Sequence, residues 1–541
     1  MWKAELSDTP FITSNGTELP STAKVSYLSE QGEVLSTKLY GFGDEKWLFE
    51  NFSKGNFSLS EIYFKNFSVK DFINTNLETK SITDFIAESC FFDGETDLSD
   101  TFFLGKKFSM AQSVFANGNV SFRGSVLEVN VADMNNITFD KGTLDFHIVR
   151  VPNARISFSG SKFGSGEINF DFSIFSKEGL DFSGAQFGDI EMTFRNTTFN
   201  NGNILFFGTE FGNGIISFGG AKMGNANLDF SFSQYKNCEI RFRHTVFGFG
   251  KLNFNGLSNK SGKLFFEVCE FRGKNMSFAN SELGEINFNR CTFSEHVDMS
   301  VNSCKALTLN NCIIEKSFDM SASHRRKVEI GTFNISHTKN LGQIDIDWRY
   351  NKVHSMIFAQ GDTTTYHDKA NQFRLLKENF RNLGRYSDED EAYVAFKRCE
   401  SWSGIRDKFD ENFEKSKFSR FLNRLAYPFK WFVLDYIGRY ATNPFRILGA
   451  MFLSIFVFTI LYSMPFVILQ GEKELFLLTN NKWIHDIVKA LYHSIATNFT
   501  IGYGDVNPGN FIAMILSGIQ GFFGLFLMSY FTVAFVRKIL R

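Results

Sequence analysis

The sequence predicts a multidomain protein with an N-terminal β-solenoid, an α-helical linker and a C-terminal membrane domain that contains two spanning helices and a re-entrant helix. Three observations predict this fold class. An aromatic repeat of fixed period runs through the first half of the 541 residues, helical spacing replaces it in the linker, and two long uncharged stretches follow. A chain of this length is expected to fold as two or more domains.

The repeat has a period of 12 residues. An apolar residue recurs at 17 successive steps from Ile86 to Phe278, and most of these residues are phenylalanine. Another apolar residue follows five positions later in every copy except the one that carries Asn259. Segments such as 166–171 alternate like β-strands, and the Gly, Asn and Ser residues between them favour turns. A short fixed period of this kind indicates a solenoid in which each coil buries its face against the next.

The spacing of the phenylalanines resembles that of the pentapeptide-repeat proteins, here in an interrupted form. The resemblance implies a right-handed parallel β-helix over residues 86–350. We expect two repeats, about 24 residues, to form one coil, because 12 residues hardly enclose so many aromatic rings. A β-sandwich of short strands is the alternative, although it does not require the register to hold over so long a segment. Residues 1–85 follow a looser pattern and are expected to form a cap with early repeats, and the register slips after Phe293.

The composition argues against catalysis and nucleic-acid binding. The net charge of the whole chain is −1 and no basic stripe is present. Outward repeat positions are mostly Ser, Gly and Asn rather than clustered carboxylates, so neither an enzyme nor a cofactor is expected. The seven cysteines include no C-x-x-C pair and are expected to be reduced packing residues, with a zinc site as the alternative. Residues 324–327 (His-Arg-Arg-Lys) form either a solvated coil edge or a site for an anionic ligand or lipid headgroup.

Residues 362–440 are predicted to be a helical linker. Phe373, Leu376 and Phe380 have helical spacing with charges on the opposite face, and a second such segment follows Gly384. The pair resembles the helix–turn–helix of a tetratricopeptide unit. Residues 421–440 place aromatic side chains among basic ones, which is typical either of an interfacial helix on the inner leaflet or of a soluble linker helix.

Residues 441–541 are predicted to be the membrane domain. The stretches 447–469 and 511–536 carry no charge. A bilayer core of about 30 Å needs about 20 helical residues, so each stretch is long enough to cross it; two buried helices of a soluble core are the alternative. Residues 484–499 have helical spacing over a shorter length, which favours a re-entrant helix. The non-helical loop that follows it is tolerated within a membrane only when protein surrounds it.

The loop after the short helix reads Thr-Ile-Gly-Tyr-Gly-Asp over residues 500–505. This motif, together with the order of span, short helix, loop and span, resembles the two-transmembrane-helix potassium channels over residues 440–541. The resemblance implies a selectivity filter whose backbone carbonyls replace the hydration shell of K⁺. Consecutive carbonyls point to one axis only if the backbone alternates in handedness, which glycine permits at little steric cost. The implied filter residues are Thr500, Ile501, Gly502, Tyr503 and Gly504.

The resemblance also implies roles for residues around the filter. Tyr492 and Asp505 are expected to support it through a hydrogen bond, whereas Ala496 stands where some channels place a Glu. Gly524 falls at the position of the hinge glycine of the family. Because glycines recur every three residues at 518, 521 and 524, close helix packing is the alternative.

The gate is predicted from helical spacing on the second span. Leu525, Met528 and Thr532 share a face with Gly521 and are expected to line the cavity, with a phenylalanine at 531 or 535 as a hydrophobic constriction. Neither span carries an arginine ladder, so a voltage sensor of that type is not expected.

One chain supplies one filter loop, so conduction requires a closed homotetramer, in which each chain has three identical partners. Seven basic residues flank the two spans on their outer sides against three between them, which places both termini in the cytoplasm of a multi-pass protein of the cell membrane. Membrane lipid is therefore also a partner, and K⁺ is a permeant ion rather than a cofactor.

The function predicted from these features is passive K⁺ conduction, regulated through the cytoplasmic solenoid by an unidentified protein or ligand. The helices of residues 362–440 are expected to pull on the first span. Two alternatives remain: a membrane-anchored solenoid that acts as a scaffold, and a non-selective cation channel, which Tyr503 between its two glycines disfavours.

Overall fold

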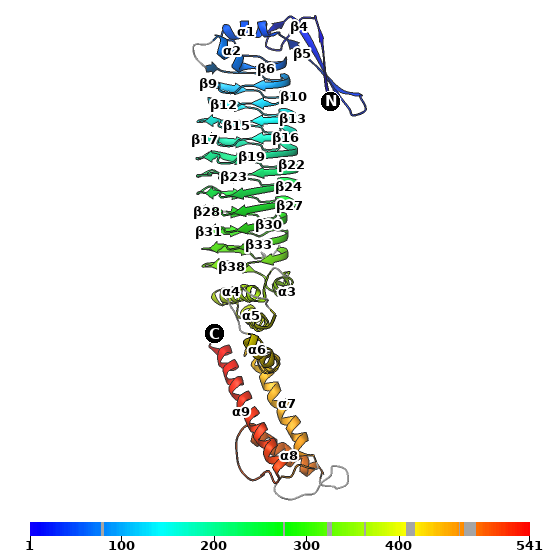
Figure 1. Ribbon diagram of the computed structural model, residues 1–541, viewed down its shortest axis with the longest axis vertical. Coiled ribbons are helices and arrows are strands. Elements are labelled where there is room, and N and C mark those ends of the chain that lie inside the picture. Colours follow the sequence, from blue (N-terminus) through cyan, green and yellow to red (C-terminus); the bar gives the residue numbers. More distant parts are fainter. Residues whose placement is uncertain are drawn as a thin grey trace. The chain divides into compact units, whose positions relative to one another are not determined.

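The structure is a computed structural model that describes residues 1–76, 81–273, 276–321, 327–361, 364–406, 417–464, 466–469 and 483–540. The chain divides into two units, Met1–Gln360 and Gly361–Arg541. The first unit is a parallel β-solenoid with an N-terminal cap, and the second contains the linker helices and the two long apolar helices (Figure 1). Three of the four residues of the predicted basic patch, 324–326, lie outside the described residues.

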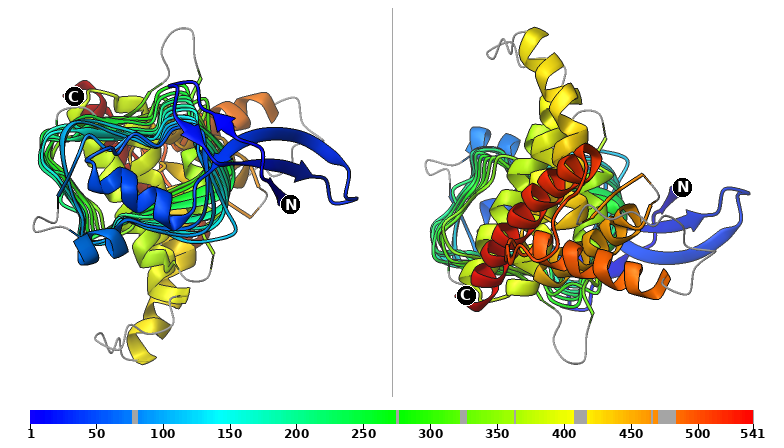
Figure 2. Two further views of the ribbon diagram at one scale, coloured as in Figure 1. Left: turned by 90° about the horizontal axis from the view of Figure 1, so that it is seen from above. Right: turned by 90° about the horizontal axis from the view of Figure 1, so that it is seen from below.

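The cap combines an antiparallel ribbon with two short helices. In the ribbon, β4 pairs antiparallel with both β1 and β5, and β5 then pairs parallel with β6, the first rung of the solenoid. The ribbon projects sideways from the coils, which superimpose when viewed along the solenoid (Figure 2, left). The elements are β1 (Trp2–Ser7), β2 (Phe11–Ile12), β3 (Glu18–Leu19), β4 (Ser21–Leu28), β5 (Val34–Phe42), α1 (Glu45–Ser53), β6 (Ile62–Ser68) and α2 (Val69–Asn76).

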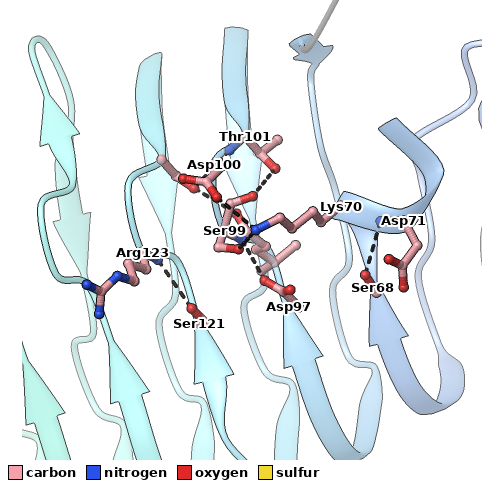
Figure 3. A network of polar contacts seen from close by, with 11 residues as sticks. Ser68, Lys70, Asp71, Asp97, Ser99, Asp100, Thr101, Ser121 and Arg123 are labelled. Atoms are coloured by element: carbon pink, nitrogen blue, oxygen red, sulfur yellow. Dashed lines mark hydrogen bonds and ion pairs between the residues drawn. The ribbon is translucent and has the colours of Figure 1, made fainter. Parts of the chain in front are cut away.

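A polar network joins the cap to the coil beneath it (Figure 3). Lys70 of α2 donates to the Asp100 carboxylate at 2.8 Å and to the Ser99 hydroxyl at 3.2 Å. The Asp97 carboxylate accepts from the Ser99 amide at 2.9 Å, which forms a turn at the coil corner. The same bond, in which an Asp or Asn side chain accepts from the amide two residues later, recurs along the solenoid, for example from the His147 amide to the Asp145 carboxylate.

Parallel strands build the coils. One sheet contains β8 (Phe91–Asp97), β10 (Val114–Ala116), β11 (Val120–Ser121), β13 (Thr138–Asp145), β16 (Lys162–Asn169), β19 (Gln186–Thr193), β22 (Glu210–Ser217), β24 (Gln234–Arg243), β27 (Ser258–Glu267), β30 (Glu282–Asn289), β33 (Ser303–Asn310) and β36 (Glu329–Asn334). A second contains β7 (Ser81–Thr83), β9 (Phe102–Ser109), β12 (Val126–Asp133), β14 (Arg150–Val151), β15 (Arg155–Ser157), β17 (Ile174–Phe175), β18 (Gly179–Asp181), β20 (Thr198–Phe199), β21 (Asn203–Leu205), β23 (Leu228–Asp229), β26 (Leu252–Asn253), β29 (Met276–Ser277), β32 (His296–Asp298), β35 (Ser317–Met320) and β38 (Gln343–Ile346). A third contains β25 (Val246–Phe247), β28 (Glu270–Phe271), β31 (Thr292–Phe293), β34 (Ile313–Ile314) and β37 (Lys339–Asn340).

The register confirms the predicted coil. Phe139 pairs with Phe163, and the Ile137 amide bonds the Ser161 hydroxyl 24 residues later, so two sequence repeats make one turn. Later coils depart from this length: His296 pairs with Ser317, 21 residues later, whereas Ser317 pairs with Gln343, 26 residues later. The register shifts between Lys65 and Phe67 in the first rung and again between Asn259 and Lys263, before the slip expected after Phe293.

Stacked phenylalanine rings fill the solenoid. In one column the centroids of Phe146, Phe170 and Phe194 are 4.9 and 5.0 Å apart with nearly parallel planes. Burying a phenylalanine contributes about 1.5–3 kcal/mol, and an aromatic pair adds about 0.5–1.5 kcal/mol. Repeated at every coil, this packing stabilises the solenoid through contacts between neighbouring turns. The two longest columns are Phe122, Phe146, Phe170, Phe194, Phe218, Phe242, Phe266 and Phe288, and Phe158, Phe182, Phe206, Phe230, Phe254 and Phe278.

A ladder of buried hydroxyls, which the sequence analysis did not find, satisfies carbonyls at the coil corners. Thr197 donates to the Phe170 carbonyl at 2.7 Å, and serines or threonines do the same in neighbouring coils. Cys269 occupies the equivalent place and lies 3.4 Å from the Phe242 carbonyl. All seven cysteines are buried, which fits their expected role in packing, and burial raises the pKa of the Cys238 thiol to about 12.

The second unit contains the helices of the linker and of the apolar C-terminal region. The helical hairpin of α4 and α5 begins with a capping box between Thr365 and Asp368 and turns at Gly384, whose φ is 69°. Leu425 and Phe429 of α6 are strongly exposed, as is Tyr436 of the π-helical turn η1. The helices of the second unit are α4 (Tyr366–Asn382), α5 (Tyr386–Arg406), α6 (Lys417–Lys430), η1 (Trp431–Ile437), α7 (Pro444–Tyr462), α8 (Trp483–Asn498) and α9 (Phe511–Ile539). The short helix α3 (Val353–Phe358) belongs to the first unit and follows its last strand.

We expect Phe194→Ala to destabilise the solenoid by about 3–5 kcal/mol, because it removes a fully buried ring from the centre of a column. Pulse proteolysis of the full chain in increasing urea would show a lower midpoint for cleavage within the coils. Phe207→Ala is the matched control, since that ring is 50% exposed. Equal midpoints for the two variants would contradict the stacked core.

Candidate functional site

Three helices of the second unit form the frame of the site. Among the described residues, α7 and α9 are long and apolar enough to cross a membrane, each with a mean hydropathy of 2.0. They contact each other through Ile447, Met451 and Leu527, while other large apolar side chains, such as Phe522, remain exposed. α7 begins at Pro444, with Asn443 as its N-cap, and ends at Tyr462, before the end of the span predicted at 447–469.

The chain leaves the short helix α8 at Asn498, and residues 501–504 have no regular secondary structure. The backbone φ is positive at Thr500 (53°), Gly502 (64°) and Gly504 (76°) but not at Ile501 or Tyr503. The handedness therefore alternates from residue to residue. Positive φ suits glycine, whereas in the β-branched Thr500 it is a strained conformation.

The backbone amides and carbonyls of the alternating loop differ in their hydrogen bonding. Its first amides are satisfied: Thr500 N donates to Thr497 O at 3.2 Å and Ile501 N to Ala496 O at 2.9 Å. Within the described part of the chain, no hydrogen bond reaches the carbonyl oxygens of residues 500–504. The C-terminal end of α8, which carries partial negative charge, also lies at the start of this loop. The result is a row of oxygen acceptors that favours a cation.

Polar contacts hold the far end of the loop. Tyr492 Oη donates to Asp505 Oδ2 at 2.7 Å, which is the bond expected from the sequence. His493 is buried beside it, with Nδ1 at 3.2 Å from Val506 O and Nε2 at 3.0 Å from Ser517 Oγ. The Ser517 hydroxyl also accepts from Tyr462 Oη at 3.3 Å, so α7, α8 and α9 meet at this point. The sequence analysis did not single out His493.

The glycines of α9 differ in their surroundings. A Cβ at Gly524 would lie 2.0 Å from the Asn498 carbonyl oxygen, whereas a Cβ at Gly521 would be 3.9 Å from Thr497 and one at Gly518 would meet no atom within 4 Å. Gly524 therefore permits close packing of α9 against α8, and its role as a hinge stays a prediction.

The residues predicted to line a cavity lie on α9, beyond Gly524. Leu525, Met528 and Thr532 are exposed in the single chain, and the rings of Phe531 and Phe535 stack at 5.6 Å. A single chain leaves both the lipid-facing and the axis-facing sides of α9 uncovered, so the assignment of these residues to a cavity stays a prediction.

The C-terminal end of α9 is tied to α5 by charges that the sequence analysis used only for topology. Arg537 lies 3.3 Å from Asp390 and 3.8 Å from Glu389, and its guanidinium stacks 4.3 Å above the Tyr393 ring. Nearby, Arg398 of α5 makes two bonds of 2.8 Å to the Asp435 carboxylate of η1. In the sequence, the run of acidic residues at 388–391 and the basic pair at 537–538 could have indicated this contact.

Comparison with known proteins identifies the C-terminal region. Residues 445–541 match the family model described as "Ion channel", which spans α7, α8, the alternating loop and α9. No curated protein and no solved structure matches the chain. Among the described residues, no group of three or more His, Cys, Asp or Glu side chains is placed to hold a metal ion. The match at residues 445–541 gives the C-terminal region the features of an ion channel domain, which supports a pore-forming subunit in a membrane.

We expect Gly524→Ala to destabilise the channel domain by about 1–3 kcal/mol, because the new methyl group overlaps the Asn498 carbonyl. Gly518→Ala is the control: alanine is favoured over glycine in a helix by up to about 1 kcal/mol, and no atom obstructs it. Thermal unfolding in detergent, followed by circular dichroism, compares the two. A Gly524→Ala melting temperature at or above that of Gly518→Ala would contradict the packing described.

Proposed function

We propose that the protein is the pore-forming subunit of a potassium-selective channel that conducts K⁺ passively through residues 500–504 of four identical chains. The observation that carries this proposal is the alternating backbone of the loop, which leaves consecutive carbonyl oxygens without a partner inside an ion channel domain. Rings of backbone carbonyls replace the hydration shell of K⁺ in potassium channels. An ion channel domain also supports transport rather than enzymatic activity.

Assembly follows from the same loop. One chain supplies one row of oxygens, and a ring around an ion requires several copies in closed symmetry. Hydrogen-bonding backbone groups are tolerated at membrane depth only when they face protein or a water-filled path. Four chains around one axis satisfy both requirements, with the exposed apolar residues of α7 and α9 divided between neighbouring chains and lipid.

The basic residues that flank α7 and α9 support a cell-membrane protein with both of these flanks in the cytoplasm. The solenoid then lies in the cytoplasm as well, where a protein or small ligand can reach it. We propose that regulation passes from α5 to α9 through Arg537, Asp390 and Glu389, because these ion pairs join the linker directly to the end of α9. This route differs from the pull on the first span expected from the sequence.

Bi-ionic recordings in planar bilayers test the selectivity. A permeability ratio of K⁺ over Na⁺ of tenfold or more shifts the reversal potential by at least roughly 59 mV. We expect Gly502→Ala to abolish this selectivity, because alanine disfavours the positive φ of that position. Gly449→Ala on α7, where no atom lies within 4 Å of the added Cβ, is the control. Equal passage of both ions would favour a non-selective channel, and no current would favour a scaffold.

Single-channel recordings test the coupling through Arg537. We expect Arg537→Gln to change the open–closed equilibrium about fivefold, which corresponds to roughly 1 kcal/mol of coupling. Asp390→Asn should have the same effect, and the double variant should add little because the two residues share one interaction. Lys538→Gln is the control, since this side chain is more exposed and its nitrogen is 4.0 Å from Asp390. An unchanged open probability in Arg537→Gln would reject this route.

A further inference from the structure

Gln520 of α9 is fully buried at the contact with α8, although it lies in one of the two most apolar helices. Its side-chain nitrogen donates to the Ser494 hydroxyl at 2.6 Å and to the Ser494 carbonyl at 3.0 Å. An amide nitrogen carries two protons, so both are used on one residue of α8. The pair of bonds fixes the distance between the helices and also the rotation of α8 about its axis.

Ser494 extends this link to the third helix. Its hydroxyl donates to the Ile455 carbonyl of α7 at 2.9 Å while it accepts from Gln520. Ser494 is buried, and its hydroxyl proton and one acceptor site are both occupied. A single side chain of α8 is therefore bonded to both long helices of the frame.

The position of Ser494 connects this link to the alternating loop. Ser494 precedes Thr500 by fewer than two helical turns, and one turn beyond it the Asn498 carbonyl packs against Gly524. α8 is thus held against α9 at two successive turns immediately before the loop begins. Residues two apart on a helix face nearly opposite directions. Ala496 therefore lies on the face of α8 opposite Ser494, and its methyl side chain cannot form a hydrogen bond there.

The chemistry at this contact is not that of ordinary packing. In the described part of the chain, Gln520 Oε1 and both polar side-chain atoms of Asn498 are buried without a hydrogen-bond partner. Buried polar groups left unpaired cost stability, whereas apolar side chains of similar shape would pack here without that cost. The side-chain amides of Gln520 and Asn498 therefore indicate that this contact is needed to orient α8 and not only to bury surface.

We propose that Gln520 is a positioning residue of the filter: through Ser494 it sets the axial rotation and depth of α8, and so the direction of the carbonyls of residues 500–504. This inference rests on the proposed function, because a filter must exist for its direction to matter. A displacement of these oxygens weakens their fit around a dehydrated K⁺ and so reduces selectivity.

The test compares permeability ratios of K⁺ over Na⁺ for the full chain in planar bilayers. We expect Gln520→Leu and Ser494→Ala each to lower the ratio by roughly fivefold or more, because each removes the bond between the Gln520 amide and the Ser494 hydroxyl together with a second buried bond. Ser494→Thr retains the hydroxyl and should stay within about twofold of the unmodified chain. The double variant Gln520→Leu with Ser494→Ala should lower the ratio little further, because both changes break one link.

A structural control separates positioning from stability. Leu527→Ala removes a buried side chain from the α7–α9 contact without touching a polar group. It should lower the melting temperature at least as much as Gln520→Leu does and leave the permeability ratio unchanged. If Gln520→Leu does not assemble, the comparison of Ser494→Ala with Ser494→Thr decides the proposal.

The outcomes distinguish this inference from the function on which it rests. An unmodified chain that does not prefer K⁺ would overturn both. A selective unmodified chain whose ratio is unaffected by Gln520→Leu and Ser494→Ala would overturn only the role of Gln520. A fall in the ratio of Leu527→Ala equal to that of Gln520→Leu would also overturn it, since general destabilisation would then explain the loss.

Discussion

The carbonyl oxygens of residues 500–504, which accept no hydrogen bond from any residue that the structure describes, are the constraint on which the account of the channel domain depends. Such groups are not tolerated against lipid, so the loop requires protein on its flanks and an ion or water in front of it. The backbone φ is positive at Thr500, Gly502 and Gly504 and not at the residues between them. Bonds of α8 flank the loop, from Ser494 to Ile455 of α7 before it and from Tyr492 to Asp505 after it. A requirement for several chains around one axis follows from the same oxygens.

The two units differ in how their backbone carbonyls are hydrogen-bonded. In the solenoid each strand bonds the strand of the next coil, and buried hydroxyls such as that of Thr197 satisfy the carbonyls at the corners. Stacked phenylalanines then make every coil depend on its neighbours. In the channel domain, the side chains of Ser494 and Gln520 bond α8 to its neighbouring helices, and the backbone of residues 500–504 that follows α8 accepts no hydrogen bond among the described residues. The first unit is built from regularly repeated coils, whereas the second departs from regular secondary structure at residues 501–504.

Sequence reasoning predicted the features that depend on spacing. The 24-residue coil follows from a period kept by residues as far apart as Phe122 and Phe278, whereas the Tyr492–Asp505 bond was implied by the resemblance to the two-transmembrane-helix potassium channels. It did not find the hydroxyl ladder, because Ser, Thr and Cys in that place look like turn composition. Hydropathy could not set the end of α7, since apolar residues continue past Tyr462 where the helix stops. The recurrence of glycine every three residues could not distinguish Gly524 from Gly518 and Gly521, because it does not show which glycine meets α8. Arg537 was used only to orient the chain in the membrane, because the sequence does not show that it contacts Asp390.

Electron cryomicroscopy of the full chain in lipid nanodiscs with K⁺ as the permeant cation tests the central claim most directly. The account predicts four chains around one axis, with ion density on that axis flanked by the backbone oxygens of residues 500–504. A different number of chains at the axis, or oxygens of this loop directed away from it in K⁺, would contradict the account.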